Sequence, residues 1–61
     1  MATIFYESND VLHWFDIADE DDAPIMVEQL NNERTAEEVQ DGVRYCWRSQ
    51  TILPDFFNNI V

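Results

Sequence analysis

The sequence contains no lysine, and three arginines are its only strong bases. They stand against thirteen acidic residues, so the formal net charge of the 61-residue chain is −10. Nucleic-acid backbones and anionic membranes attract proteins mainly through Lys and Arg side chains. The composition therefore argues against direct nucleic-acid binding and against attachment to an anionic membrane.

Other scarce features restrict the cellular compartment and the membrane association of the protein. A single cysteine, Cys46, excludes an intramolecular disulfide and suits a reducing compartment. The longest uninterrupted apolar run, residues 4–6, is far too short to span a membrane. The first residues lack the basic and apolar regions of a secretory signal. These observations predict a cytoplasmic protein.

The length bounds both the architecture and the chemistry. Sixty-one residues suffice for one small domain, residues 1–61, and leave no room for a second core. An enzyme is disfavoured, because a catalytic pocket needs walls that so short a chain lacks. A hydrophobic fraction of 46% with eight aromatic residues favours a folded core over disorder. Because such a core is marginal, a homodimer is an open alternative to a monomer.

Apolar spacing predicts a mostly α-helical domain of three to four short helices with a short N-terminal strand. Residues 3–6 are β-branched or aromatic, which favours the strand. A helix is expected over residues 10–20, with N-cap side chains at residues 8–10. The apolar residues at helical spacing in this segment are Val11, Trp14, Phe15 and Ala18.

A second helix is expected to begin near Pro24, because proline suits the first helical turn. Asp21 or Asp22 precedes it and would serve as its cap. The helix ends at residues 31–32. Residues 25–27 are also compatible with a strand.

A capping box marks the third predicted helix, since Thr35 is followed three residues later by Glu38. The apolar stripe after it extends this helix to residue 48. A strand over residues 43–48, with side chains alternating between two faces, is the rival interpretation. An α+β domain is therefore the alternative fold. A last short helix is expected after Pro54, with an apolar face of Phe56, Phe57, Ile60 and Val61.

The negative charge is concentrated in the first half of the chain. Residues 1–33 carry nine acids and no arginine, whereas residues 34–61 carry four acids and all three arginines. On the predicted first helix, neighbouring carboxylates stand about 5–6 Å apart. Duplex DNA carries one charge per about 1.7 Å of axis, which is a similar length scale. A solvated surface that only aids solubility is the plainer interpretation.

This charge pattern predicts a protein partner with a basic, nucleic-acid-binding surface. The acidic residues expected to contact it are Asp16, Asp19, Glu20, Asp21, Asp22 and Glu28.

In size, acidity and absence of lysine, the chain resembles the DNA-mimic proteins of phages and mobile elements. Those proteins block restriction enzymes, CRISPR effectors, repair glycosylases or polymerases. The resemblance implies an anti-CRISPR or anti-restriction type of inhibitor, which binds the nucleic-acid channel of a host nuclease in the host cytoplasm. No motif of such a family is matched, so the resemblance assigns a role to no residue.

A protein–protein adaptor, monomeric or homodimeric, is the alternative function. Aromatic residues occur as near neighbours along the chain, and adjacent helical side chains point about 100° apart. In so small a domain some rings must therefore reach the surface, where they make good interface anchors. The expected exposed anchors are Tyr6, Trp14 and Tyr45.

The sequence predicts no metal site and no cofactor. His13 is the single histidine and has no second His or Cys at ligand spacing. The acidic run that begins at Asp19 does not fit an EF-hand loop. Counted from Asp19, Pro24 stands where glycine is needed and Leu30 where the bidentate glutamate belongs.

Overall fold

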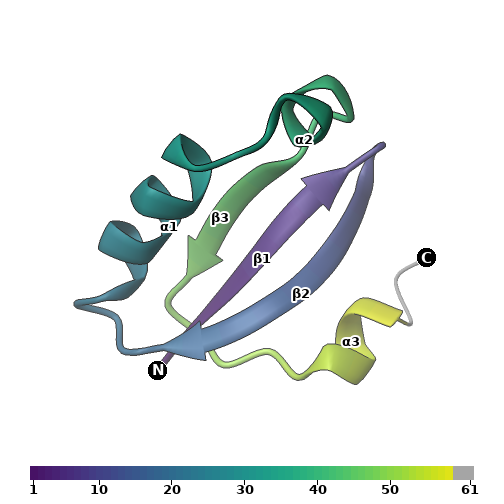
Figure 1. Cartoon of the computed structure of the whole chain (residues 1–61). Helices are drawn as coiled ribbons and strands as arrows, with labels where there is room; N and C mark the ends of the chain where they lie inside the picture. The colour runs from purple at the N-terminus through teal and green to yellow at the C-terminus, as the bar shows by residue number, and fades with distance from the viewer. Residues whose placement is uncertain (59–61) are drawn as a thin grey trace.

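The computed structural model describes residues 1–58, so the predictions for Ile60 and Val61 lie outside the described residues. The elements in chain order are β1 (Ala2–Ser8), β2 (Val11–Ala18), α1 (Ala23–Asn32), α2 (Ala36–Gln40), β3 (Arg44–Arg48) and α3 (Pro54–Asn58). The strands form one antiparallel sheet in the order β2-β1-β3 (Figure 1). The expectation of a mostly helical domain is therefore wrong, and the fold is a small α+β domain. Within residues 1–58, no helix is long and apolar enough to cross a membrane.

The largest correction concerns residues 10–20, which form the strand β2 and the start of a turn instead of a helix. Asn9 and Asp10 have φ values of 53° and 66°, and they join β1 to β2 with Ser8 opposite Val11. A two-residue turn with both residues in the left-handed region matches the twist of the strands that it connects. Asn and Asp tolerate this conformation, so the residues predicted to cap a helix form a hairpin turn.

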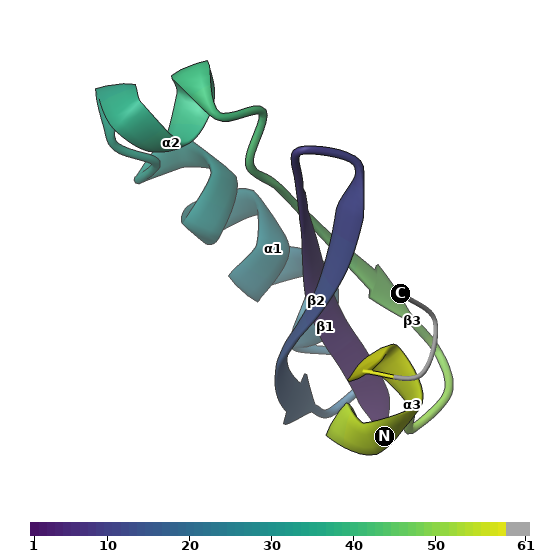
Figure 2. The ribbon, with the colours of Figure 1, turned by 90° about the vertical axis from the view of Figure 1, so that its right-hand side faces the viewer.

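The central strand, β1, holds much of the core. Residues 2–5 are at most 8% exposed, because β2 and β3 flank the strand and helices α1 and α3 pack against the sheet. Phe5 packs against Phe57 of α3, with ring centroids 5.8 Å apart. Figure 2 shows α1 and α2 together on one side of the sheet and α3 apart from them. The strand predicted over residues 3–6 is confirmed and is longer than predicted.

Helix α1 is attached to the outer edge of β3 by polar side chains. The Asn31 amide nitrogen donates to the Tyr45 carbonyl at 3.1 Å, and its amide oxygen accepts from the Tyr45 N–H at 2.9 Å. The Arg34 guanidinium donates to the Val43 carbonyl at 2.7 Å. These side chains occupy backbone groups that a fourth strand would otherwise use. The predicted start of α1 is confirmed, with Pro24 in the first turn. Asp22 stands at the N-cap position, but its side chain makes no capping hydrogen bond, so the predicted cap is wrong.

The predicted capping box is present at the start of α2. Thr35 Oγ1 accepts from the Glu38 N–H at 3.2 Å, and Glu38 Oε1 accepts from the Thr35 N–H at 3.1 Å. The helix ends at Gln40 instead of residue 48. Gly42 then adopts a φ of 76°, which favours glycine, and turns the chain into β3. The rival interpretation of residues 43–48 as a strand is therefore the correct one.

Thr3 connects the segment after β3 to the central strand. Its side chain is fully buried, and Oγ1 donates to the Gln50 carbonyl at 2.6 Å. The same oxygen accepts from the Ile52 N–H at 2.5 Å. These two hydrogen bonds fix the chain between the end of β3 and Pro54, where α3 begins. Phe57 of α3 then packs on Phe5 of the central strand.

The hairpin turn generates a direct test by the substitution Asp10→Gly. Glycine adopts a left-handed φ without the steric cost that a Cβ atom imposes. We expect the free energy of unfolding, measured by urea denaturation, to rise by about 0.5–1 kcal/mol. Asp10→Asn removes the same charge and keeps a Cβ, so it separates the backbone effect from the electrostatic one. A decrease in stability for Asp10→Gly would contradict the turn, because glycine weakens a helix.

Candidate functional site

The two faces of the sheet carry different side chains. Side chains alternate along a strand, so the pairing of β3 with β1 places Arg44 and Arg48 on the same face as Phe5. Tyr45 and Tyr6 lie on the opposite face. We call the side of Phe5 the α3 face, because Phe5 contacts α3. The side of Tyr6 and Tyr45 is the α1 face, because α1 and α2 lie there (Figure 2).

The α1 face has carboxylates and no fully exposed arginine. Arg34 is half-buried and donates to the carbonyls of Asn31 at 2.9 Å and Val43 at 2.7 Å. Arg44 and Arg48 are exposed on the α3 face. The acidic residues of α1, of α2, of the turns that follow these two helices and of the α1 face of β2 are Asp16, Glu28, Glu33, Glu37, Glu38 and Asp41, all exposed except the half-buried Glu38.

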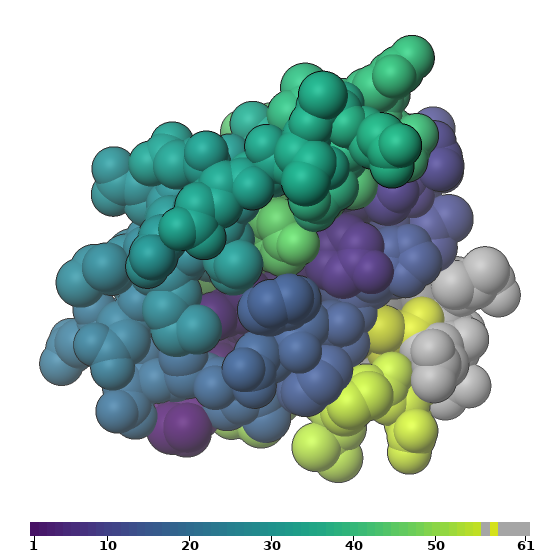
Figure 3. Space-filling model, in the orientation of Figure 1, coloured from purple at the N-terminus to yellow at the C-terminus, as the bar shows by residue number. Residues whose placement is uncertain are grey.

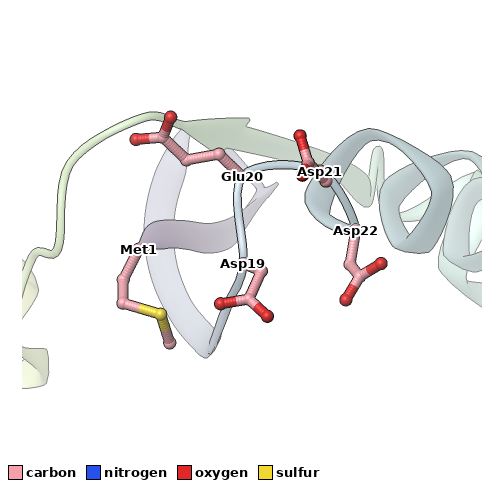
Figure 4. Close-up of a pocket in the computed structure, with 5 residues that line it drawn as sticks. All are labelled: Met1, Asp19, Glu20, Asp21 and Asp22. Carbon is pink, nitrogen blue, oxygen red and sulfur yellow. The ribbon is translucent and has the colours of Figure 1, made fainter.

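The row of carboxylates predicted on the first helix does not exist, because residues 10–20 form a strand and the start of a turn instead of that helix. Asp16 lies on β2, residues 19–22 form the connection to α1, and Glu28 lies on α1. Figure 4 shows the four acids of the connection pointing in different directions around a shallow hollow beside Met1. In the described part of the chain, no three His, Cys, Asp or Glu side chains are placed to hold a metal ion.

A β-bulge brings an aromatic ring and a carboxylate to the same face. Ile4 lies opposite Asp16 and Phe5 lies opposite Trp14, so Phe15 is an extra residue in β2. In a regular strand, Phe15 and Asp16 would point to opposite faces. The bulge instead places Asp16 on the α1 face with Ile4, while the Phe15 ring contacts Tyr45 on that face.

Four rings from all three strands form a cluster on the α1 face. We call Tyr6, His13, Phe15 and Tyr45 the aromatic cluster. Tyr6 stacks on His13 with centroids 4.8 Å apart, and it contacts Tyr45 at 5.4 Å. Phe15 meets Tyr45 at 5.3 Å with an interplanar angle of 84°. Figure 3 shows atoms of all three strands reaching the surface next to the helices on this face.

The structure separates the three aromatic anchors predicted from the sequence. Tyr6 and Tyr45 come together, half-buried, in the aromatic cluster. Trp14 lies opposite Phe5, so its side chain belongs to the α3 face. The indole Nε1 of Trp14 is buried and has no hydrogen-bond partner among residues 1–58.

Phe15 and His13 belong to the site but were not predicted from the sequence as members of it. His13 lies opposite Tyr6 because the hairpin turn sets the register of β2. A turn assigned at residues 9–10 would have revealed this pair. Phe15, which is 38% exposed, reaches the cluster through the bulge, and no sequence motif marks the bulge.

The phenol of Tyr45 lies beside the Glu38 carboxylate. Burial raises the pKa of Tyr45, and the Glu38 carboxylate and the Tyr6 phenol raise it further. All three influences disfavour a phenolate at this position. Tyr45 therefore stays a neutral hydrogen-bond donor in the middle of the cluster.

The chain matches no protein-family model, no curated protein and no solved structure. The charges and rings of the two faces are therefore the features from which a function can be inferred.

The raised pKa of Tyr45 predicts a loss of stability in alkaline solution. The folded state holds the phenolic proton more tightly than the unfolded state. The stabilisation is therefore complete below the ordinary pKa of about 10 and is lost as the pH rises through the higher folded value. We expect the free energy of unfolding to fall more between about pH 8 and about pH 11 in the native protein than in Tyr45→Phe.

Urea denaturation at the two pH values measures this difference. Glu38→Gln is expected to give an intermediate fall, because it removes one of the causes of the shift and keeps a side chain suited to the capping box. Equal falls in the native protein and Tyr45→Phe would contradict this assignment.

Proposed function

We propose that the protein is an acidic inhibitor of the DNA-mimic type, which binds a basic, nucleic-acid-binding surface of another protein through its α1 face. The observation that carries this proposal is the separation of charge between the two faces. The α1 face has carboxylates and the internally bonded Arg34, whereas Arg44 and Arg48 are exposed on the α3 face.

The shape of the domain supports binding through a face. Its Cα atoms extend over 30 × 28 × 11 Å, so the molecule is a thin plate. Each broad side is comparable with the roughly 800 Å² that one partner buries in a standard protein–protein interface. A large face on a small domain suits a binding protein.

The charge supports recognition of a basic partner. A net charge of −10 attracts a cationic groove over a long range and raises the association rate. Most of the acidic side chains on the α1 face lie on helices or on β2, so the sheet and its helices position them. Two copies that met through this face would place like charges together, which disfavours such a homodimer.

A protein–protein adaptor is the second candidate, and the aromatic cluster favours it. Aromatic rings at a surface are typical anchors of protein interfaces. In that case the acidic residues keep the protein in solution, and binding depends little on salt.

Capture experiments distinguish the two candidates. The immobilised protein is incubated with a bacterial lysate at low salt and at about 0.5 M salt, where charge attraction is strongly screened. We expect nucleic-acid-binding proteins to be retained at low salt and released by high salt or by added DNA. Retention that neither salt nor DNA reduces would contradict the mimic and favour the adaptor.

Two double variants with the same change of charge test which face binds. Glu28→Lys with Glu37→Lys alters the helices of the α1 face, whereas Glu7→Lys with Asp55→Lys alters the α3 face. We expect the first variant to lose most of the capture and the second to keep most of it. Equal losses would contradict the assignment to the α1 face.

A further inference from the structure

We propose that the aromatic cluster, with the adjacent carboxylates of Asp16 and Glu38, is a subsite for an arginine side chain of the partner protein. This inference rests on the proposed function and names the residue type that the acidic face recognises. Arginine and lysine carry the same charge, so net charge alone does not distinguish them, whereas the rings and the carboxylate geometry do.

The rings favour a guanidinium over an ammonium group. A guanidinium is planar and weakly hydrated and stacks on aromatic faces, whereas the lysine ammonium is compact and strongly hydrated. Phe15 is 38% exposed, and its near-perpendicular contact with Tyr45 leaves at least one face of its ring free of Tyr45. Phe15 therefore offers an accessible ring on a surface that attracts cations.

The two carboxylates are held next to the rings. The bulge puts Asp16 beside Phe15 on the α1 face, and Asp16 Oδ1 accepts from the Ile17 N–H at 2.8 Å. On the other side of the cluster, Glu38 lies next to Tyr45, and its Oε1 accepts from the Thr35 N–H. Backbone N–H groups thus orient both carboxylates. Glu38 is also a hydrogen-bond partner of Tyr45. A carboxylate has about four lone-pair sites, so both retain acceptor capacity for the N–H donors of a guanidinium.

The occupant is an arginine of a different protein. Arg44 and Arg48 of this chain lie on the α3 face, away from the cluster. A second copy could present them only by bringing two net charges of −10 together, which repel each other. A cationic partner instead gains from the charge of the whole face.

Isothermal titration with hexa-arginine and hexa-lysine peptides at low salt tests the proposal. The two peptides carry equal charge, so general attraction to the acidic face is the same for both. We expect hexa-arginine to bind about two- to five-fold more tightly. Phe15→Leu should reduce this preference, because it lowers the affinity for hexa-arginine more than the affinity for hexa-lysine, whereas Phe15→Tyr should keep the preference.

Further variants serve as matched controls. Leu53→Ala truncates another exposed apolar side chain and should leave both affinities unchanged. Glu38→Gln should weaken hexa-arginine binding more than Glu28→Gln, which removes a charge from α1. Urea denaturation confirms that each variant is folded.

The outcomes separate this inference from the proposed function. Equal affinities for the two peptides, or equal losses of both in Phe15→Leu, would overturn the arginine subsite and leave an acidic binding face. Failure of both peptides to bind would overturn the proposed function together with the subsite.

Discussion

The fold depends on the pairing of β1 along both of its edges. In so short a chain, the sharing of one strand between two neighbours, together with the helices packed against the sheet, buries residues 2–5 almost completely. The hairpin supplies one neighbour, and β3 supplies the other after the chain has formed α1 and α2. The outer edge of β3 is then closed by Asn31 and Arg34. Arg34 thereby serves the architecture, and the α1 face keeps its negative charge.

The same pairing assembles the aromatic cluster. Tyr6 lies opposite His13 on β2 and opposite Tyr45 on β3, so the register alone aligns three rings across the sheet. The bulge adds Phe15 and, next to it, a carboxylate on the same face. Charge and aromatic surface, which seemed to belong to rival functions in the sequence, meet on one face. The proposed arginine-bearing partner would contact both.

Sequence patterns within a few residues of one another correctly predicted the starts of α1, α2 and β1, because neighbouring residues determine these starts. The capping box at Thr35, the proline in the first turn of α1 and the β-branched start of β1 were all found from neighbouring residues. The strand after Asp10 was not predicted correctly, because Asn and Asp suit both helix caps and hairpin turns. The sequence shows the concentration of acidic residues in the first half of the chain, but it does not show how they divide between the α1 face and the α3 face of the sheet. That distribution depends on register and on the bulge, which arise from pairing between distant residues.

Amide hydrogen exchange, measured on the protein alone and bound to a nucleic-acid-binding partner captured at low salt, tests the central claim most directly. The claim is that the carboxylates and rings of the α1 face form the binding surface. The account predicts that binding slows exchange in α2 and around Phe15 in β2, while exchange in α3 stays unchanged. Protection confined to α3 and residues 50–53, beside the face of Arg44 and Arg48, would contradict it.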